Sequence, residues 1–107
     1  MNTDNVNLDR IKWLAEEICH ELDLPEYRRT IHRVFLVFCY VAGYEVENSQ
    51  YDYEGEVRNE PCVRVNSAKE THEIIRNINI PIFVKPLGPN NGYSIFASIK
   101  DDPFNNR

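Results

Sequence analysis

Apolar residues recur every three or four positions in the first part of the chain, which predicts helices there. One apolar stripe runs through residues 8–22, and a second runs from about residue 26 to residue 42. Asp23 and Glu26 have capping-box spacing before the second stripe, and Gly43 suits the left-handed residue that ends a helix. The sequence therefore predicts two N-terminal helices.

The second half of the second predicted helix, residues 34–41, is apolar on every side. A helix of this kind is either buried on several faces or lies in a contact between subunits. A homodimer that pairs through residues 26–42 is therefore one hypothesis for the assembly.

After Tyr44 the period of the apolar pattern changes from 3.6 to 2, which indicates strands. The predicted strands lie at residues 44–46, 51–58, 62–65, 80–84 and 93–99. A turn is expected at Asn59-Glu60-Pro61, and the polar loop 87–92 separates the last two strands. Ser67 and Glu70 have capping-box spacing and predict a third helix.

This order of elements predicts an α+β fold in a single domain spanning residues 1–107, with residues 1–6 and 101–107 frayed. Two N-terminal helices precede a β-β-β-α-β-β unit. Residues 62–86 are long enough for a right-handed parallel crossover. We therefore expect a mostly antiparallel, mixed sheet covered by helices.

Cellular location is predicted from two further features. The N-terminus has no signal-peptide pattern, and the apolar run at residues 34–44 is 11 residues long, against the roughly 20 that cross a bilayer. Cys19, Cys39 and Cys62 are odd in number and have apolar neighbours, which predicts buried, unpaired thiols in a reducing compartment. A cytoplasmic protein without membrane contact is expected.

The negative charge of the chain is concentrated in residues 45–60. This segment has six acidic residues and one basic residue, Arg58, so its net charge of -5 equals that of the whole chain. On a strand, alternate acids would point to one face and the tyrosines to the other. The candidate partner-binding residues are Glu45, Glu47, Tyr51, Asp52, Tyr53, Glu54 and Glu56.

Several interpretations of this acidic segment stay open. It is an edge strand whose charges discourage aggregation, a face that binds a basic protein partner, or a row of carboxylates that imitates a nucleic-acid backbone. A calcium loop would need a different pattern of ligands and a central glycine. We expect a small, acidic, non-enzymatic binding protein that inhibits or regulates its partner, similar in size and charge to phage-encoded inhibitors of host defence.

A basic cluster at the start of the second predicted helix supports an alternative function. Its residues are Arg28, Arg29, His32 and Arg33. Arginine suits phosphate recognition, so this face is a candidate for nucleic-acid binding. The acidic pI of about 5.1 and the shortage of other basic residues to extend the patch argue against nucleic-acid binding. The cluster is otherwise a solvated face, or the complement of the acidic segment in a second copy.

Catalytic and metal-binding patterns are absent from the sequence. The histidines fall in separate predicted helices, and there is no His-x-x-x-His or Cys-x-x-Cys pair to hold zinc. No catalytic residue, metal or cofactor is therefore expected.

The predicted order helix, three strands, helix, strand resembles the core of restriction-endonuclease-like nucleases and small junction resolvases. Asp52 would stand at the position of the first acid of that family. Arg64 and Asn66 occupy the positions of its glutamate and lysine on the third strand. The resemblance therefore implies a catalytically inactive, nuclease-like domain.

Overall fold

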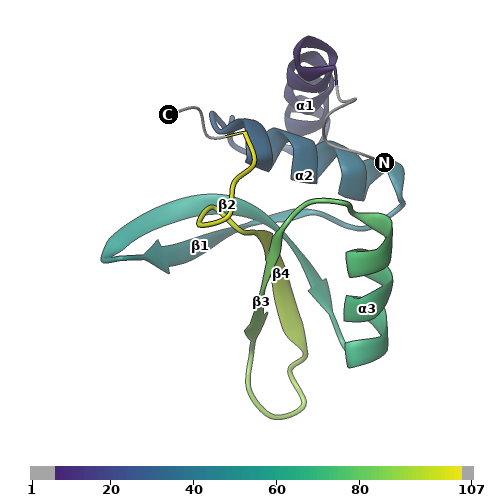
Figure 1. The fold of residues 1–107 in the computed structure, drawn as a ribbon, viewed down its shortest axis with the longest axis vertical. Helices are drawn as coiled ribbons and strands as arrows, with labels where there is room; N and C mark the ends of the chain where they lie inside the picture. Colours follow the sequence, from purple (N-terminus) through teal and green to yellow (C-terminus); the bar gives the residue numbers. More distant parts are fainter. Residues whose placement is uncertain (1–6, 105–107) are drawn as a thin grey trace.

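The computed structural model describes residues 7–104. Its elements are α1 (Leu8–Leu22), α2 (Thr30–Val41), β1 (Glu47–Tyr53), β2 (Glu56–Val65), α3 (Ala68–Asn77), β3 (Ile82–Pro86) and β4 (Tyr93–Ala97). Helices combined with one four-stranded sheet confirm the α+β class (Figure 1).

The strand order of the sheet is β1-β2-β4-β3, and every neighbouring pair is antiparallel. Strands β2 and β3 run in the same direction because both are antiparallel to β4, which lies between them. The connection through α3 is therefore a crossover that skips one strand. The prediction of a mostly antiparallel sheet is confirmed, but no two neighbouring strands are parallel.

The predicted unit of three consecutive strands is wrong, because this region forms one two-stranded hairpin. The hairpin turn falls at Glu54 and Gly55, inside the predicted strand 51–58, and these residues have φ angles of 52° and 82°. Two successive positive φ angles are typical of a two-residue hairpin turn, whose backbone twist matches the twist of the two strands that it joins. Strand β2 then continues through residues 59–61, which were predicted to form a turn.

Pro61 lies within β2, a position from which proline is usually excluded. Its Cα partner on β1 is Asn48, while the pairing of β2 with β4 covers only Cys62–Val65. One edge of β2 is therefore unpaired at Pro61, so the missing N–H interrupts no bond to β4.

The second helix begins four residues later than predicted. Asp23 has a φ of 56° and its N–H donates to the carbonyl of Cys19, so it ends α1 in the left-handed conformation and does not cap α2. The following segment is not helical, and its Tyr27 is buried with its hydroxyl donating to Asn48 Oδ1 at 3.0 Å. Tertiary contacts of Tyr27 thus override the local capping signal.

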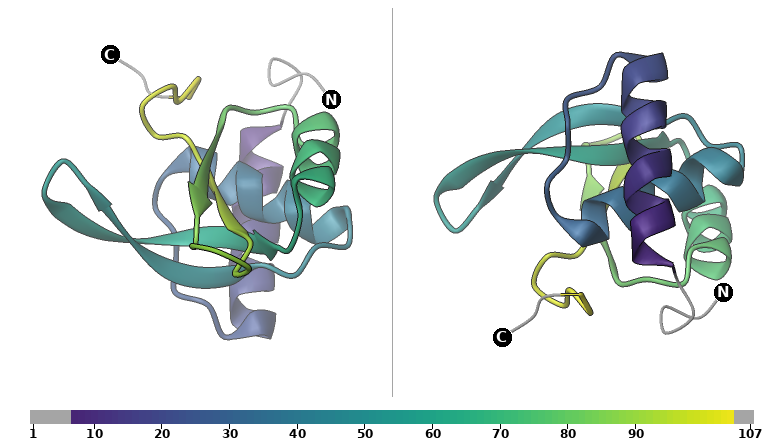
Figure 2. Two further views of the ribbon diagram at one scale, coloured as in Figure 1. Left: turned by 90° about the horizontal axis from the view of Figure 1, so that it is seen from below. Right: turned by 90° about the horizontal axis from the view of Figure 1, so that it is seen from above.

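Helix α2 packs between α1 and the sheet, as Figures 1 and 2 show. Its buried apolar residues are Ile31, Val34, Phe35, Leu36, Val37 and Cys39. Only Tyr40 and Val41, at the C-terminal end, are substantially exposed. Burial within one chain therefore explains the all-round apolar composition, and a contact between subunits is not needed for it.

Several local predictions are confirmed. Helix α1 has the predicted bounds, and Ser67 Oγ accepts from the Glu70 N–H at 3.2 Å. The three cysteines are free and buried. Residues 1–6 and 105–107, which were predicted to fray, lie outside the described residues, whereas Phe104 is half-buried against the core.

We predict that Gly92→Ala destabilises the fold more than Gly43→Ala. Both glycines have positive φ angles, 77° and 90°, so alanine costs roughly 1 kcal/mol of backbone strain at either site. A Cβ at Gly92 would also overlap the carbonyl oxygen of Val65, whereas a Cβ at Gly43 meets nothing within 4 Å. We expect a loss of about 3 kcal/mol at Gly92 in urea unfolding. Equal losses in the two variants would contradict this account.

Candidate functional site

The acidic segment forms an arm that extends beyond the rest of the sheet. Strand β2 pairs with β4 only from Cys62 onward, so residues 47–61, called here the hairpin arm, are paired only within the β1–β2 hairpin over most of their length. Figures 1 and 2 show the turn of this arm projecting past β3 and β4. The segment is therefore accessible from several sides.

The carboxylates of the segment do not form the predicted row on one strand. Asp52 is the last residue but one of β1, Glu54 lies in the turn and Glu56 begins β2. The carboxylate of Asp52 accepts from the N–H of Gly55 at 3.0 Å and so stabilises the turn. The acids are therefore displayed around the end of the arm and do not line one face.

Five of the six acids are exposed, and two of them lie close to arginines of β2. Glu56 Oε2 is 3.2 Å from Arg58 Nη2, and Glu47 Oε1 is 4.0 Å from Arg64 Nε. The other exposed acids are Glu45, Asp52 and Glu54. Exposed pairs of this kind are weak and are screened by salt. A surplus of exposed carboxylates over guanidinium groups therefore remains.

The tyrosines of the arm are largely used in packing. The ring of Tyr51 stacks on Phe96 with centroids 5.1 Å apart and contacts Phe83 at 5.3 Å, and Tyr53 lies 6.4 Å from Tyr51. Both tyrosines are half-buried. Burial raises the pKa of Tyr51, with a further contribution from Glu60. These rings hold the arm against the sheet and offer a partner only their remaining surface.

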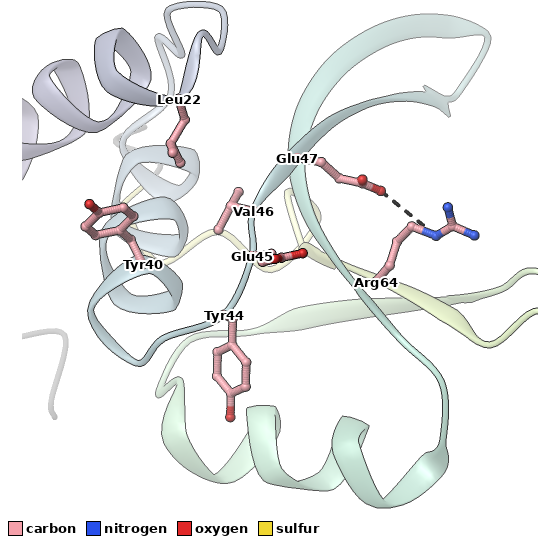
Figure 3. A pocket seen from close by; sticks show the side chains of 7 residues that line it. All are labelled: Leu22, Tyr40, Tyr44, Glu45, Val46, Glu47 and Arg64. Atoms are coloured by element: carbon pink, nitrogen blue, oxygen red, sulfur yellow. Dashed lines mark ion pairs between the residues drawn. The ribbon is translucent and has the colours of Figure 1, made fainter.

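Two of the acids line a groove at the C-terminal end of α2. The groove has a volume of about 430 Å³. Figure 3 shows its lining side chains: Leu22, Tyr40, Tyr44, Glu45, Val46, Glu47 and Arg64. Glu45 and Glu47 extend on the side of the chain that faces Arg64, and Val46 points toward the helices. The groove thus combines apolar walls with two carboxylates.

Hydrogen bonds fix the two tyrosines of this groove. The hydroxyl of Tyr40 donates to Glu21 Oε2 at 3.1 Å, and the hydroxyl of Tyr44 accepts from Asn77 Nδ2 at 3.0 Å. The sequence reading did not include Tyr40 and Tyr44 among the candidate residues. One feature of the sequence could have identified them: they flank the predicted helix end at Gly43 and lie next to the acidic segment.

The sixth acid, Glu60, which was predicted to lie in a turn, is fully buried within β2. Its Oε1 lies 3.7 Å from His32 Nε2, and neither this nitrogen nor the two carboxyl oxygens of Glu60 have a hydrogen-bond partner among the described residues. Burial raises the pKa of Glu60 to about 7, although Arg58 and Arg29 oppose the shift. Burial also lowers the pKa of His32 to about 4, with contributions from the same arginines. Near pH 6 both groups are therefore mainly uncharged.

The predicted basic face is divided in the structure. Arg28 and Arg29 precede α2, His32 is buried, and Arg33 Nε donates to the carbonyl of Tyr27 at 2.8 Å. The four residues therefore do not form one exposed helical face. Instead, Arg28 and Arg29 lie beside Arg58, which comes from the hairpin arm.

Within residues 7–104, no group of three or more His, Cys, Asp or Glu side chains is placed to hold a metal ion. No helix in the same range is long and apolar enough to cross a membrane.

The chain matches no protein-family model, no curated protein and no solved structure. The resemblance to nucleases rested on three strands before α3, and the structure has two there. Asp52, the acid carried over from that family, caps the hairpin turn, whereas Arg64 lies near the far end of β2 and Asn66 directly follows that strand. The order of elements therefore no longer supports that resemblance.

We predict that Glu60→Gln changes how stability depends on pH. A raised pKa in the folded state means that the contribution of Glu60 to stability is present below pH 4.5 and is lost as the pH rises through 7. Glutamine cannot ionise, so the variant should gain about 2 kcal/mol over the natural protein between about pH 5 and about pH 8. Urea unfolding at several pH values measures this.

The matched control is Glu56→Gln, which removes an exposed carboxylate from the same strand. Its stability relative to the natural protein should change little over the same pH range. A parallel pH profile for Glu60→Gln and the natural protein would show that Glu60 is not held in its protonated form.

Proposed function

We propose that this protein is a non-enzymatic binding protein that docks on a basic surface of a protein partner and inhibits or regulates it. The observation that carries the proposal is the groove beside Glu45 and Glu47, with Tyr40 and Tyr44 in its walls. The hairpin arm adds further exposed carboxylates around its turn.

The chemistry of the groove suits a lysine or arginine side chain. Such a side chain has an apolar stem and a cationic head, and the groove offers Leu22 and Val46 for the stem and two carboxylates for the head. The groove also lies at the C-terminal end of α2, where the helix dipole adds partial negative charge. These contributions all favour a cation.

The hairpin arm would act earlier in the encounter. Its exposed acids Asp52, Glu54 and Glu56 surround the projecting turn. Charges at the rim of an interface mainly accelerate association and add less to affinity. The arm therefore steers the partner, and the groove holds one of its basic side chains.

We predict that Glu45→Gln/Glu47→Gln weakens binding of a short peptide of alternating lysine and arginine by about tenfold at low salt. The control variant, Glu16→Gln/Glu73→Gln, removes the same charge from exposed positions on α1 and α3. Isothermal titration calorimetry measures both affinities. An equal loss in the control would attribute binding to net charge alone and would refute the groove as the site.

A second variant tests the hairpin arm. Asp52→Asn/Glu54→Gln/Glu56→Gln should lower the association rate of the same peptide and its salt dependence, with little change in stability. Asparagine keeps an oxygen that accepts from the Gly55 N–H, so the turn is preserved. Stopped-flow fluorescence at two ionic strengths measures the rate.

The same experiments separate docking from a purely protective role. Strand β1 is at the edge of the sheet, where charges also oppose edge-to-edge pairing. If protection were the only role, the arm variant would aggregate while peptide binding stayed unchanged. That outcome would count against the proposed function.

A further inference from the structure

A second hollow, of about 270 Å³, lies at the N-terminal end of α2 and shares no lining residue with the groove. It lies between the segment that precedes the helix and the start of β2. Its charged and polar lining includes Arg28, Arg29, His32 and Arg58, with Glu26 and Glu56. Guanidinium groups from two separate segments of the chain thus meet at one place.

Helix α2 begins beside this hollow, which its N-cap residue Arg29 lines. Helix α2 begins at Thr30, its N-cap residue Arg29 makes no side-chain capping bond, and its first turn has no acidic residue. The N–H groups of a first helical turn have no partner within the helix. Together with the partial positive charge of the helix end, they form a ready site for an anion.

A shielded, unpartnered nitrogen of Arg58, a residue that lines the hollow, is independent evidence for a ligand. His32 is 5% exposed, and its unpartnered Nε2 lies 3.7 Å from Glu60 Oε1, so this nitrogen faces Glu60. Arg58 Nε is also shielded and unpartnered, although Nη2 of the same group contacts Glu56. Leaving buried polar atoms unpaired is costly.

The number of donors favours phosphate over a carboxylate. Three guanidinium groups and a helix end offer more N–H donors than the two oxygens of a carboxylate accept, whereas a phosphate group has enough oxygens and charge. A nucleic acid fits less well, because the chain has a net charge of -5 and the acidic arm adjoins the hollow. From these observations we infer that the hollow binds the phosphate group of a small phosphorylated molecule.

Glu60 would couple this binding to pH. It lies behind His32 and is electrostatically linked to Arg29 and Arg58. In its protonated form it adds no negative charge beside the anion, whereas its ionisation, with a pKa of about 7, opposes the anion. The other charged groups that face the hollow are Arg28, Glu26 and Glu56. Anion affinity should therefore fall as the pH rises through about 7.

The test uses the full chain and three probes: inorganic phosphate, phenyl phosphate and, because its charge is constant over this range, sulfate. Amide NMR should show saturable shifts at Thr30–His32 for each anion and none with chloride at equal ionic strength. Arg28→Gln and Arg29→Gln should each weaken binding about tenfold. The control Arg64→Gln, on β2 but outside the hollow, should leave the affinity unchanged.

A second experiment measures the affinity for sulfate from about pH 6 to about pH 8. The natural protein should lose several-fold in affinity over this range, and Glu60→Gln should not. Absence of saturable shifts, or equal losses for Arg64→Gln and Arg29→Gln, overturns the proposal. Tighter, salt-dependent binding of short duplex DNA at the same amides also overturns it, because the site would then bind a polyanion.

Discussion

The burial of α2 between α1 and the sheet is the constraint on which the rest of the structure depends. Val34, Phe35 and Leu36 are fully inaccessible to solvent, and these consecutive residues point in different directions around the helix. Such a helix is stable only if it is covered on more than one side. The sheet provides one cover and the amphipathic α1 the other. The two ends of α2 are consequently the places where it reaches the surface.

The two candidate sites lie at those ends, and their charges match the helix dipole. The groove at the C-terminal end is lined by Glu45 and Glu47, and the hollow at the N-terminal end by arginines. A helix end favours a ligand of opposite charge to its own partial charge. One buried helix thus organises a site suited to cations and a site suited to anions. The hairpin contributes to both, because β1 begins beside the groove and the start of β2 borders the hollow.

Glu60 and His32 form a polar centre whose two groups affect stability in opposite directions. The raised pKa of Glu60 means that its contribution to stability is lost as the pH rises through 7. The lowered pKa of His32 means that stability is lost as the pH falls below 6.5 and approaches 4. Between these limits both groups are mainly neutral, so the cost of burying them is smallest.

The sequence by itself determined the features that depend on neighbours along the chain. The period of α1, the cap at Ser67 and the excess of acid in residues 45–60 are of this kind. Only the tertiary structure decided which of those acids reach the surface, because Glu60 is covered by residues distant in the sequence. It also decided that Tyr27 is buried, with its hydroxyl donating to Asn48. The tertiary structure also decided that the hairpin turns at Gly55. The alternating pattern continues on both sides of a two-residue turn, so the pattern alone does not show where one strand ends and the next begins. Local periodicity indicates which residues are suited to burial, whereas packing between distant segments determines which residues are buried.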